Sequence, residues 1–95
     1  MNEITQDIIE EFKLRLKLDG NDEDMNLKFI LEASVEDLIS KTGEYDITVS
    51  KRFKELVFER SRYVYNDALE FFDTNFISQI TNLSIMNSGV VSDII

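Results

Sequence analysis

The chain has 95 residues, a net charge of −9 and an apolar fraction of 43 %. It contains no cysteine and no histidine, which excludes disulfides, thiolate metal sites and the commonest general base of enzymes. A chain this short buries only about 60–65 % of its extended surface, so we expect a thin core that needs support from oligomerisation or from a partner.

The composition also favours one structural class. Proline is absent and only three glycines occur, which is typical of helices joined by short loops. The sequence has neither a long apolar run nor a basic N-terminal stretch ahead of apolar residues, so it predicts no membrane span and no secretion signal. We therefore expect a protein made in a cytoplasm, without a membrane partner.

The first helix is predicted over Thr5–Leu16. Thr5 suits an N-cap with an acidic residue in the first turn. The apolar positions that recur at helical spacing are Ile8, Ile9, Phe12 and Leu16. Leu14 and Leu18 alternate with basic residues, which leaves open an extended conformation at the end of this stretch.

A second helix is predicted from Glu23 to about Lys41, with Asn21 or Asp22 as its cap and Gly43 just beyond its end. Its apolar stripe consists of Leu27, Leu31, Val35 and Leu38, widened by Ile30 and Ile39. The turn before this helix superficially resembles a calcium-binding EF-hand loop. Where that loop requires glycine and glutamate, this chain has Asp24 and Ile30, so calcium binding is rejected.

The longest helix is predicted over Lys51–Phe72, with Ser50 as its N-cap. Its apolar stripe consists of Phe53, Leu56, Val57, Val64, Ala68, Leu69 and Phe72. The polar residues 73–75 then interrupt the pattern before a short fourth helix, roughly Phe76–Leu83. The predicted fold is a small all-α four-helix domain over residues 1–95, with two longer central helices and short N-terminal and C-terminal helices.

The end of the chain is apolar and almost uncharged, since Asp93 is the one charged residue after Asp73. Its large apolar residues are Ile85, Met86, Val90, Val91, Ile94 and Ile95. One interpretation is that residues 85–95 fold back on their own domain. The other is that a partner orders them, for example by strand addition, because Val90 and Val91 favour extended structure.

No catalytic, cofactor or metal site is predicted. Neighbouring carboxylates such as Glu10 and Glu11 point about 100° apart on a helix, so they do not converge on one site. The basic cluster at residues 51–62 could contact nucleic acid, but a chain of net charge −9 repels phosphates. The cations are expected to pair with acids of the same or a neighbouring subunit. We favour salt bridges at a subunit boundary, because Arg and Tyr are enriched in interface centres. The predicted interface residues are Arg60, Arg62, Tyr63 and Tyr65.

The order of these features resembles a known family. It runs from an acidic turn into Met25–Ser34, then Thr42-Gly43 after a helix, Arg60–Asn66 in the longest helix, and Phe76–Ser84 in a short one. The chain is similar in this order, over most of its length, to the head–tail connector (head-completion adaptor) proteins of long-tailed bacteriophages.

This resemblance implies a ring of about a dozen subunits beneath the portal of the virion. Such a ring extends the DNA channel and forms a platform for the next head-completion or tail protein, with double-stranded DNA only as passing cargo. The apolar residues from Ile85 onward would dock on the portal. The acids Asp22, Glu23 and Asp24 would face the channel or a loop beside it. The alternatives are an acidic inhibitor that mimics DNA and a helical regulator with one protein partner; a helix-turn-helix DNA binder fits least, since no helix has a mainly basic face.

Overall fold

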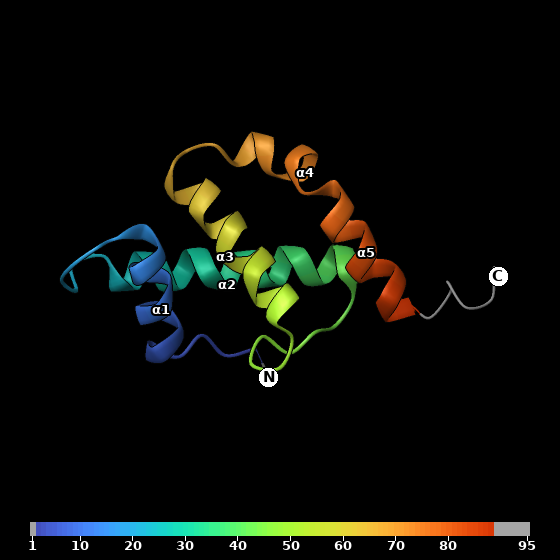
Figure 1. Cartoon of the computed structure of the whole chain (residues 1–95). Coiled ribbons are helices and arrows are strands. Elements are labelled where there is room, and N and C mark those ends of the chain that lie inside the picture. The colour runs from blue at the N-terminus through green and yellow to red at the C-terminus, as the bar shows by residue number, and fades with distance from the viewer. Residues whose placement is uncertain (1, 89–95) are drawn as a thin grey trace.

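The computed structural model describes residues 2–88, which form five α-helices and one 3₁₀ helix and contain no β-strand (Figure 1). The α-helices are α1 (Gln6–Leu16), α2 (Asp24–Thr42), α3 (Lys51–Tyr65), α4 (Phe72–Asn75) and α5 (Ile77–Ser88), and the 3₁₀ helix η1 covers Leu69–Phe71. The predicted all-α class is confirmed, and α2 and α3 are the two longest helices, as expected.

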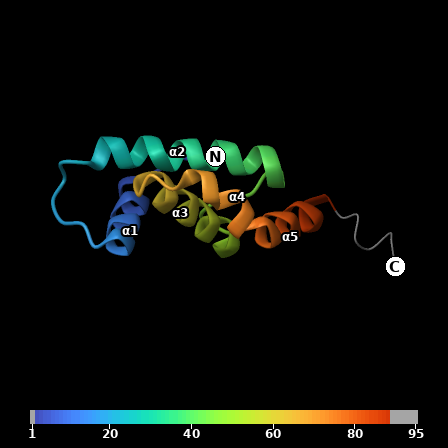
Figure 2. The same ribbon diagram turned by 90° about the horizontal axis from the view of Figure 1, so that it is seen from above.

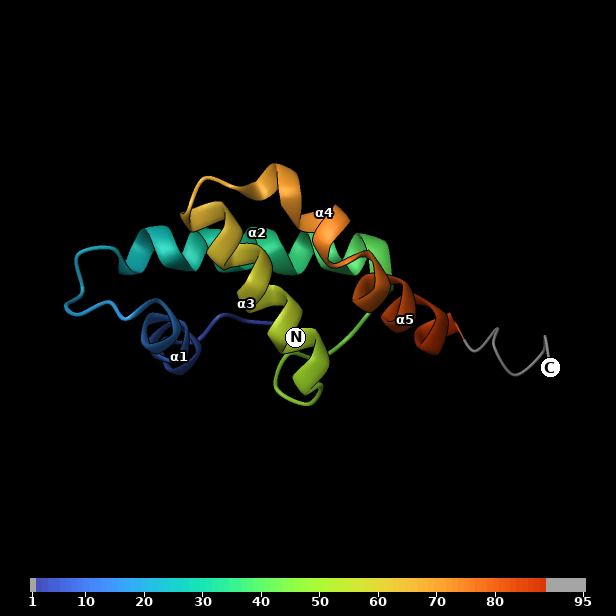
Figure 3. The same ribbon diagram turned by 45° about the horizontal axis from the view of Figure 1, so that its top comes forward.

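Helix α2 runs along one side of the molecule, and the other helices all lie on the same side of α2 (Figure 2). Figure 3 shows the loop between α1 and α2 at one end of the molecule and α5 at the other. The predicted stripe of α2 is buried against these helices, with Leu27, Leu31 and Leu38 fully enclosed. Phenylalanines from three separate segments complete the core: Phe12, Phe53 and Phe72.

Two of the predicted helix caps are confirmed. The hydroxyl of Thr5 accepts a hydrogen bond from the backbone N–H of Ile8, and that of Ser50 accepts one from Phe53. The predicted caps of α2 are wrong: Glu23 occupies the N-cap position and makes no capping bond with its side chain. The amide oxygen of Asn21 is instead bonded to the Lys13 ammonium, at 3.0 Å.

The predicted end of the third helix is also wrong, because α3 stops at Tyr65 and not at Phe72. Asp67 has a φ of 59°, a left-handed conformation that Asp tolerates better than most residues. The chain therefore turns back after α3. This turn brings Phe72 against Tyr63 of α3, with ring centroids 5.7 Å apart, and buries it completely. The fourth predicted segment is longer than expected and reaches Ser88.

Hydrogen bonds join the end of α2 to the end of α5 beside Gly43. Its φ of 85° and ψ of −178° lie in a region that is essentially restricted to glycine. A Cβ atom at this position would collide with the side chain of Asn87. That side chain donates hydrogen bonds to the carbonyl oxygens of Thr42 and Glu44, both at 3.0 Å. The glycine predicted to end this helix thus also makes room for a contact that orients α5.

Candidate functional site

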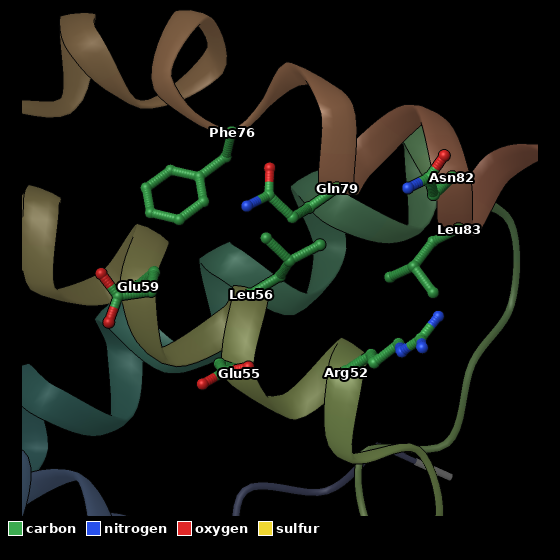
Figure 4. Close-up of a pocket in the computed structure, with 8 residues that line it drawn as sticks. All are labelled: Arg52, Glu55, Leu56, Glu59, Phe76, Gln79, Asn82 and Leu83. Carbon is green, nitrogen blue, oxygen red and sulfur yellow. The ribbon is translucent and has the colours of Figure 1, made fainter.

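A groove with a volume of about 490 Å³ lies between α3 and α5. Figure 4 shows three apolar side chains inside it, namely Leu56, Phe76 and Leu83. The polar residues around them are Arg52, Glu55, Glu59, Gln79 and Asn82. Leu56 and Leu83 form the floor of the groove and are buried by their own chain, whereas Phe76 is half-buried. A groove with apolar side chains inside and mixed polar groups around them suits the side chains of another protein segment.

Some charged groups around this groove form ion pairs within the chain and others do not. Glu59 forms ion pairs with Arg62 at 2.6 Å and with Arg15 at 3.6 Å. Arg52 and Glu55 are exposed and form no ion pair within residues 2–88. Arg52 does place a guanidinium nitrogen 3.8 Å from the Met86 sulfur. One cation and one anion beside the groove are thus available to an incoming partner.

A second unusual surface lies on the outer side of α2. Met25 and Phe29 leave 87 % and 69 % of their area exposed. They are four residues apart, so they share one side of the helix, and helical geometry places that side opposite Leu27 and Leu31. The sequence offered a signal that was missed, because both residues fall outside the apolar stripe of the predicted helix. Two large exposed apolar side chains side by side are typical of an interaction surface.

Arg60, a predicted interface residue, is bonded inside the chain. Its Nε donates to the Asp37 carboxylate of α2 at 3.1 Å, and its Nη1 donates to the Ser34 hydroxyl at 3.1 Å. Ser34 also accepts from Ser61 at 2.9 Å, and both serines are fully buried. A polar network thus joins α2 to α3 within the core. A role of Arg60 between subunits stays a prediction.

The other three predicted interface residues also have partners within the chain. Arg62 lies over the Tyr63 ring, 5.4 Å from its centroid, and the Tyr63 hydroxyl accepts a bond from Asn75 at 3.0 Å. The Tyr65 hydroxyl donates to Glu23 at 2.7 Å, and this bond raises the pKa of Tyr65 above its ordinary value. Their part in a subunit contact stays a prediction as well.

The three predicted channel acids have different environments. Asp22 is exposed and forms no ion pair in the described residues, and Glu23 is exposed and accepts the bond from Tyr65. Asp24 accepts a 2.9 Å bond from the Lys13 ammonium, which lies almost buried at the junction of α1 and α2. Bonds from Lys13 and Gln6 hold the pKa of Asp24 below its usual range. Asp24 thus has a structural partner, whereas Asp22 remains open to solvent.

We expect Asp24→Asn to destabilise the protein at neutral pH and to lose this effect in acid. A carboxylate with a lowered folded-state pKa adds stability above its unfolded pKa, about 3.9, and that stability is lost as the pH falls through the lower folded value. Urea unfolding of both proteins between neutral and acidic pH would show their midpoints converging in acid. Asp22→Asn is the matched control, with little effect at any pH. Equal effects of the two variants would contradict this account.

The apolar end of the chain is only partly described. Ile85 and Met86 are exposed on α5, whereas Val90, Val91, Ile94 and Ile95 lie outside the described residues. All of α5 lacks charged side chains, from Ile77 to Ser88, although the whole chain has 29 charged residues. Within residues 2–88, no cluster of His, Cys, Asp and Glu could hold a metal ion. No helix in this range is long and apolar enough to span a bilayer.

No family model, curated protein or solved structure matches this chain.

Proposed function

We propose that this protein is a structural subunit that acts by binding other protein chains, as a head–tail connector of a long-tailed bacteriophage. In this role about a dozen copies form a ring beneath the portal at the head–tail junction of the virion. The ring extends the DNA channel and offers a platform to the next head-completion or tail protein. No catalysed reaction is part of this function.

The observation that carries the proposal is the surface of α5. This helix of 12 residues has no charged side chain, and it exposes Ile77, Ile85 and Met86 to solvent. A helix at the surface of an acidic protein normally has charged residues on its outer side. An uncharged, partly apolar outer side favours burial against another protein. We assign this surface, together with the apolar residues that follow it, to docking on the portal.

The connector identity itself rests on the resemblance in the order of helices, and the charge of the chain agrees with it. A net charge of −9 repels the phosphates of DNA, so a channel with this charge lets DNA pass without holding it. Two of the predicted channel acids, Asp22 and Glu23, are exposed in the turn before α2 and form no ion pair in the described residues.

Light scattering behind a sizing column, over a range of protein concentrations and with added portal protein, tests this function. We expect rings of about a dozen subunits, either alone or on the portal, and weaker portal binding when Ile85 and Met86 are replaced by Ser. A protein that stays monomeric and does not bind the portal would contradict the proposal. A stable one-to-one complex with a DNA-binding enzyme would favour the DNA-mimic alternative instead.

A further inference from the structure

We infer that two copies of this chain bind each other through two different surfaces, with Met25 and Phe29 of one copy inserted into the α3–α5 groove of the next. The inference rests on the proposed ring-forming function and specifies which residues make the contact. The occupant of the groove is thus a second copy of this chain, and the part that enters it is the outer side of α2.

The exposed pair on α2 has the form of an inserted anchor. Phe29 is 69 % exposed and Met25 is 87 % exposed, one turn apart on a helix of 19 residues. Residues three or four positions apart on such a helix are neighbours and can enter one groove together. Helix α2 is held by its buried side against α3 and α5, so the pair projects from a rigid support.

The groove offers an apolar interior in which this exposed pair can be buried. Leu56, Phe76 and Leu83 give it an apolar interior, and its volume of about 490 Å³ is in the range of pockets that enclose a compact group of apolar atoms. Gln79 and Asn82 line it from the side of α5 (Figure 4). An apolar interior with a polar edge is the usual anatomy of a protein–protein contact.

The charges around the two surfaces are complementary. Lys28 and Glu32 flank Phe29 on α2, are exposed, and form no ion pair within residues 2–88. The groove offers the two opposite groups, the Glu55 carboxylate and the Arg52 guanidinium. Pairing Lys28 with Glu55 and Glu32 with Arg52 would satisfy all four at once. Such pairs at the edge of an interface fix its orientation and reduce repulsion between two acidic chains.

The two surfaces lie on opposite sides of the molecule. On α3, Ser61 points toward α2, where it is bonded to Ser34, and helical spacing places Glu55 and Glu59 on the far side of α3. Figure 4 accordingly shows the α2 ribbon behind the groove. Met25 and Phe29 lie on the side of α2 that faces away from α3. Contacts between different surfaces on opposite sides propagate from copy to copy, and they close into a ring when the rotation per subunit allows it.

Cysteine cross-linking tests the contact directly, because the natural chain has no cysteine. Asn26→Cys, beside the exposed pair on α2, and Gln79→Cys are both substitutions of exposed residues that take no part in the proposed ion pairs. A mixture of the two single variants, treated with a short bis-maleimide, should give cross-linked dimers, and the double variant should give a ladder of oligomers. Each single variant alone should give no cross-linked dimer under the same treatment. Asp7→Cys, on the exposed side of α1, replaces Asn26→Cys as the control that should give no dimer with Gln79→Cys.

Two further variants show whether Phe29 and the charges carry the contact. Phe29→Ser in the double-cysteine chain should weaken self-association at least about 30-fold, as expected for a central anchor. Glu32→Arg or Arg52→Glu alone should weaken association of the wild-type chain, and the two together should restore it. If wild-type rings form but the mixed cysteine variants give no dimer, this contact is wrong and the connector function stands. If the mixed variants cross-link but no ring forms on the portal, the contact stands and the connector function fails.

Discussion

Replacing Phe72 by Ala should lower the free energy of unfolding by about 3–5 kcal/mol, the usual cost of removing a buried phenylalanine side chain. Phe72 is 0 % exposed and touches two other rings, Tyr63 at 5.7 Å and Phe76 at 5.0 Å between centroids. These rings hold the segment after α3 against the body of the molecule. Small helical domains have little stability to spare, so this one change should leave much of the protein unfolded at room temperature. Urea unfolding followed by circular dichroism measures the loss.

The matched control is the residue before it. Phe71 has the same side chain but is 57 % exposed, so Phe71→Ala should change the free energy of unfolding by less than about 0.5 kcal/mol. Both residues lie in the same short segment, and the comparison therefore isolates burial from local helix preference. Equal losses in the two variants would contradict the packing described for this segment.

The break before Phe72 shows where sequence patterns stop being sufficient. Val64, Ala68 and Phe72 continue the helical spacing of α3 without interruption, so periodicity alone predicts one long helix. The structure instead turns at Asp67, and Phe72 packs on Tyr63 within the core. Asn66 and Asp67, which tolerate turn conformations, were the available signal. Local rules did suffice for the caps at Thr5 and Ser50, where the side chain and its bonding partner are three residues apart.

The groove could not be predicted from the sequence for a related reason. Its two sides come from two separate helices, with Arg52 on α3 and Gln79 on α5, 27 positions further along the chain. Neither helix alone indicates that the other lies beside it. The orientation of α5 depends on Asn87, Gly43 and the Tyr45 hydroxyl, which donates to the carbonyl oxygen of Leu83 at 2.7 Å. These are contacts between distant segments, and periodicity carries no information about them.

Arg60 illustrates how a charge can be predicted without its partner. The sequence indicated that the cations of the longest predicted helix pair with acids of the same or a neighbouring subunit, and a subunit boundary was the expected place for these salt bridges. The acid beside Arg60 is Asp37 of the same chain, which Lys41 also contacts at 2.9 Å. The packing of α2 against α3 decides this choice. A subunit contact at Arg60 would have to form around a side chain that already makes two bonds within its own chain.

Arg60→Met should therefore destabilise the isolated chain, by about 2–3 kcal/mol, because hydrogen bonds to charged groups contribute about 1.5–3 kcal/mol. The variant leaves Asp37 with Lys41 alone and removes the guanidinium from the buried hydroxyl of Ser34. Arg60→Lys keeps the charge but not the two-pronged geometry, so an intermediate loss is expected. Lys51→Met, on the same helix but exposed and without an ion pair in residues 2–88, should change stability by less than about 0.5 kcal/mol. Urea unfolding at several protein concentrations separates the two roles of Arg60. A loss that is the same at every concentration indicates the intramolecular network, whereas a loss seen only where the wild type assembles would assign Arg60 to a subunit boundary.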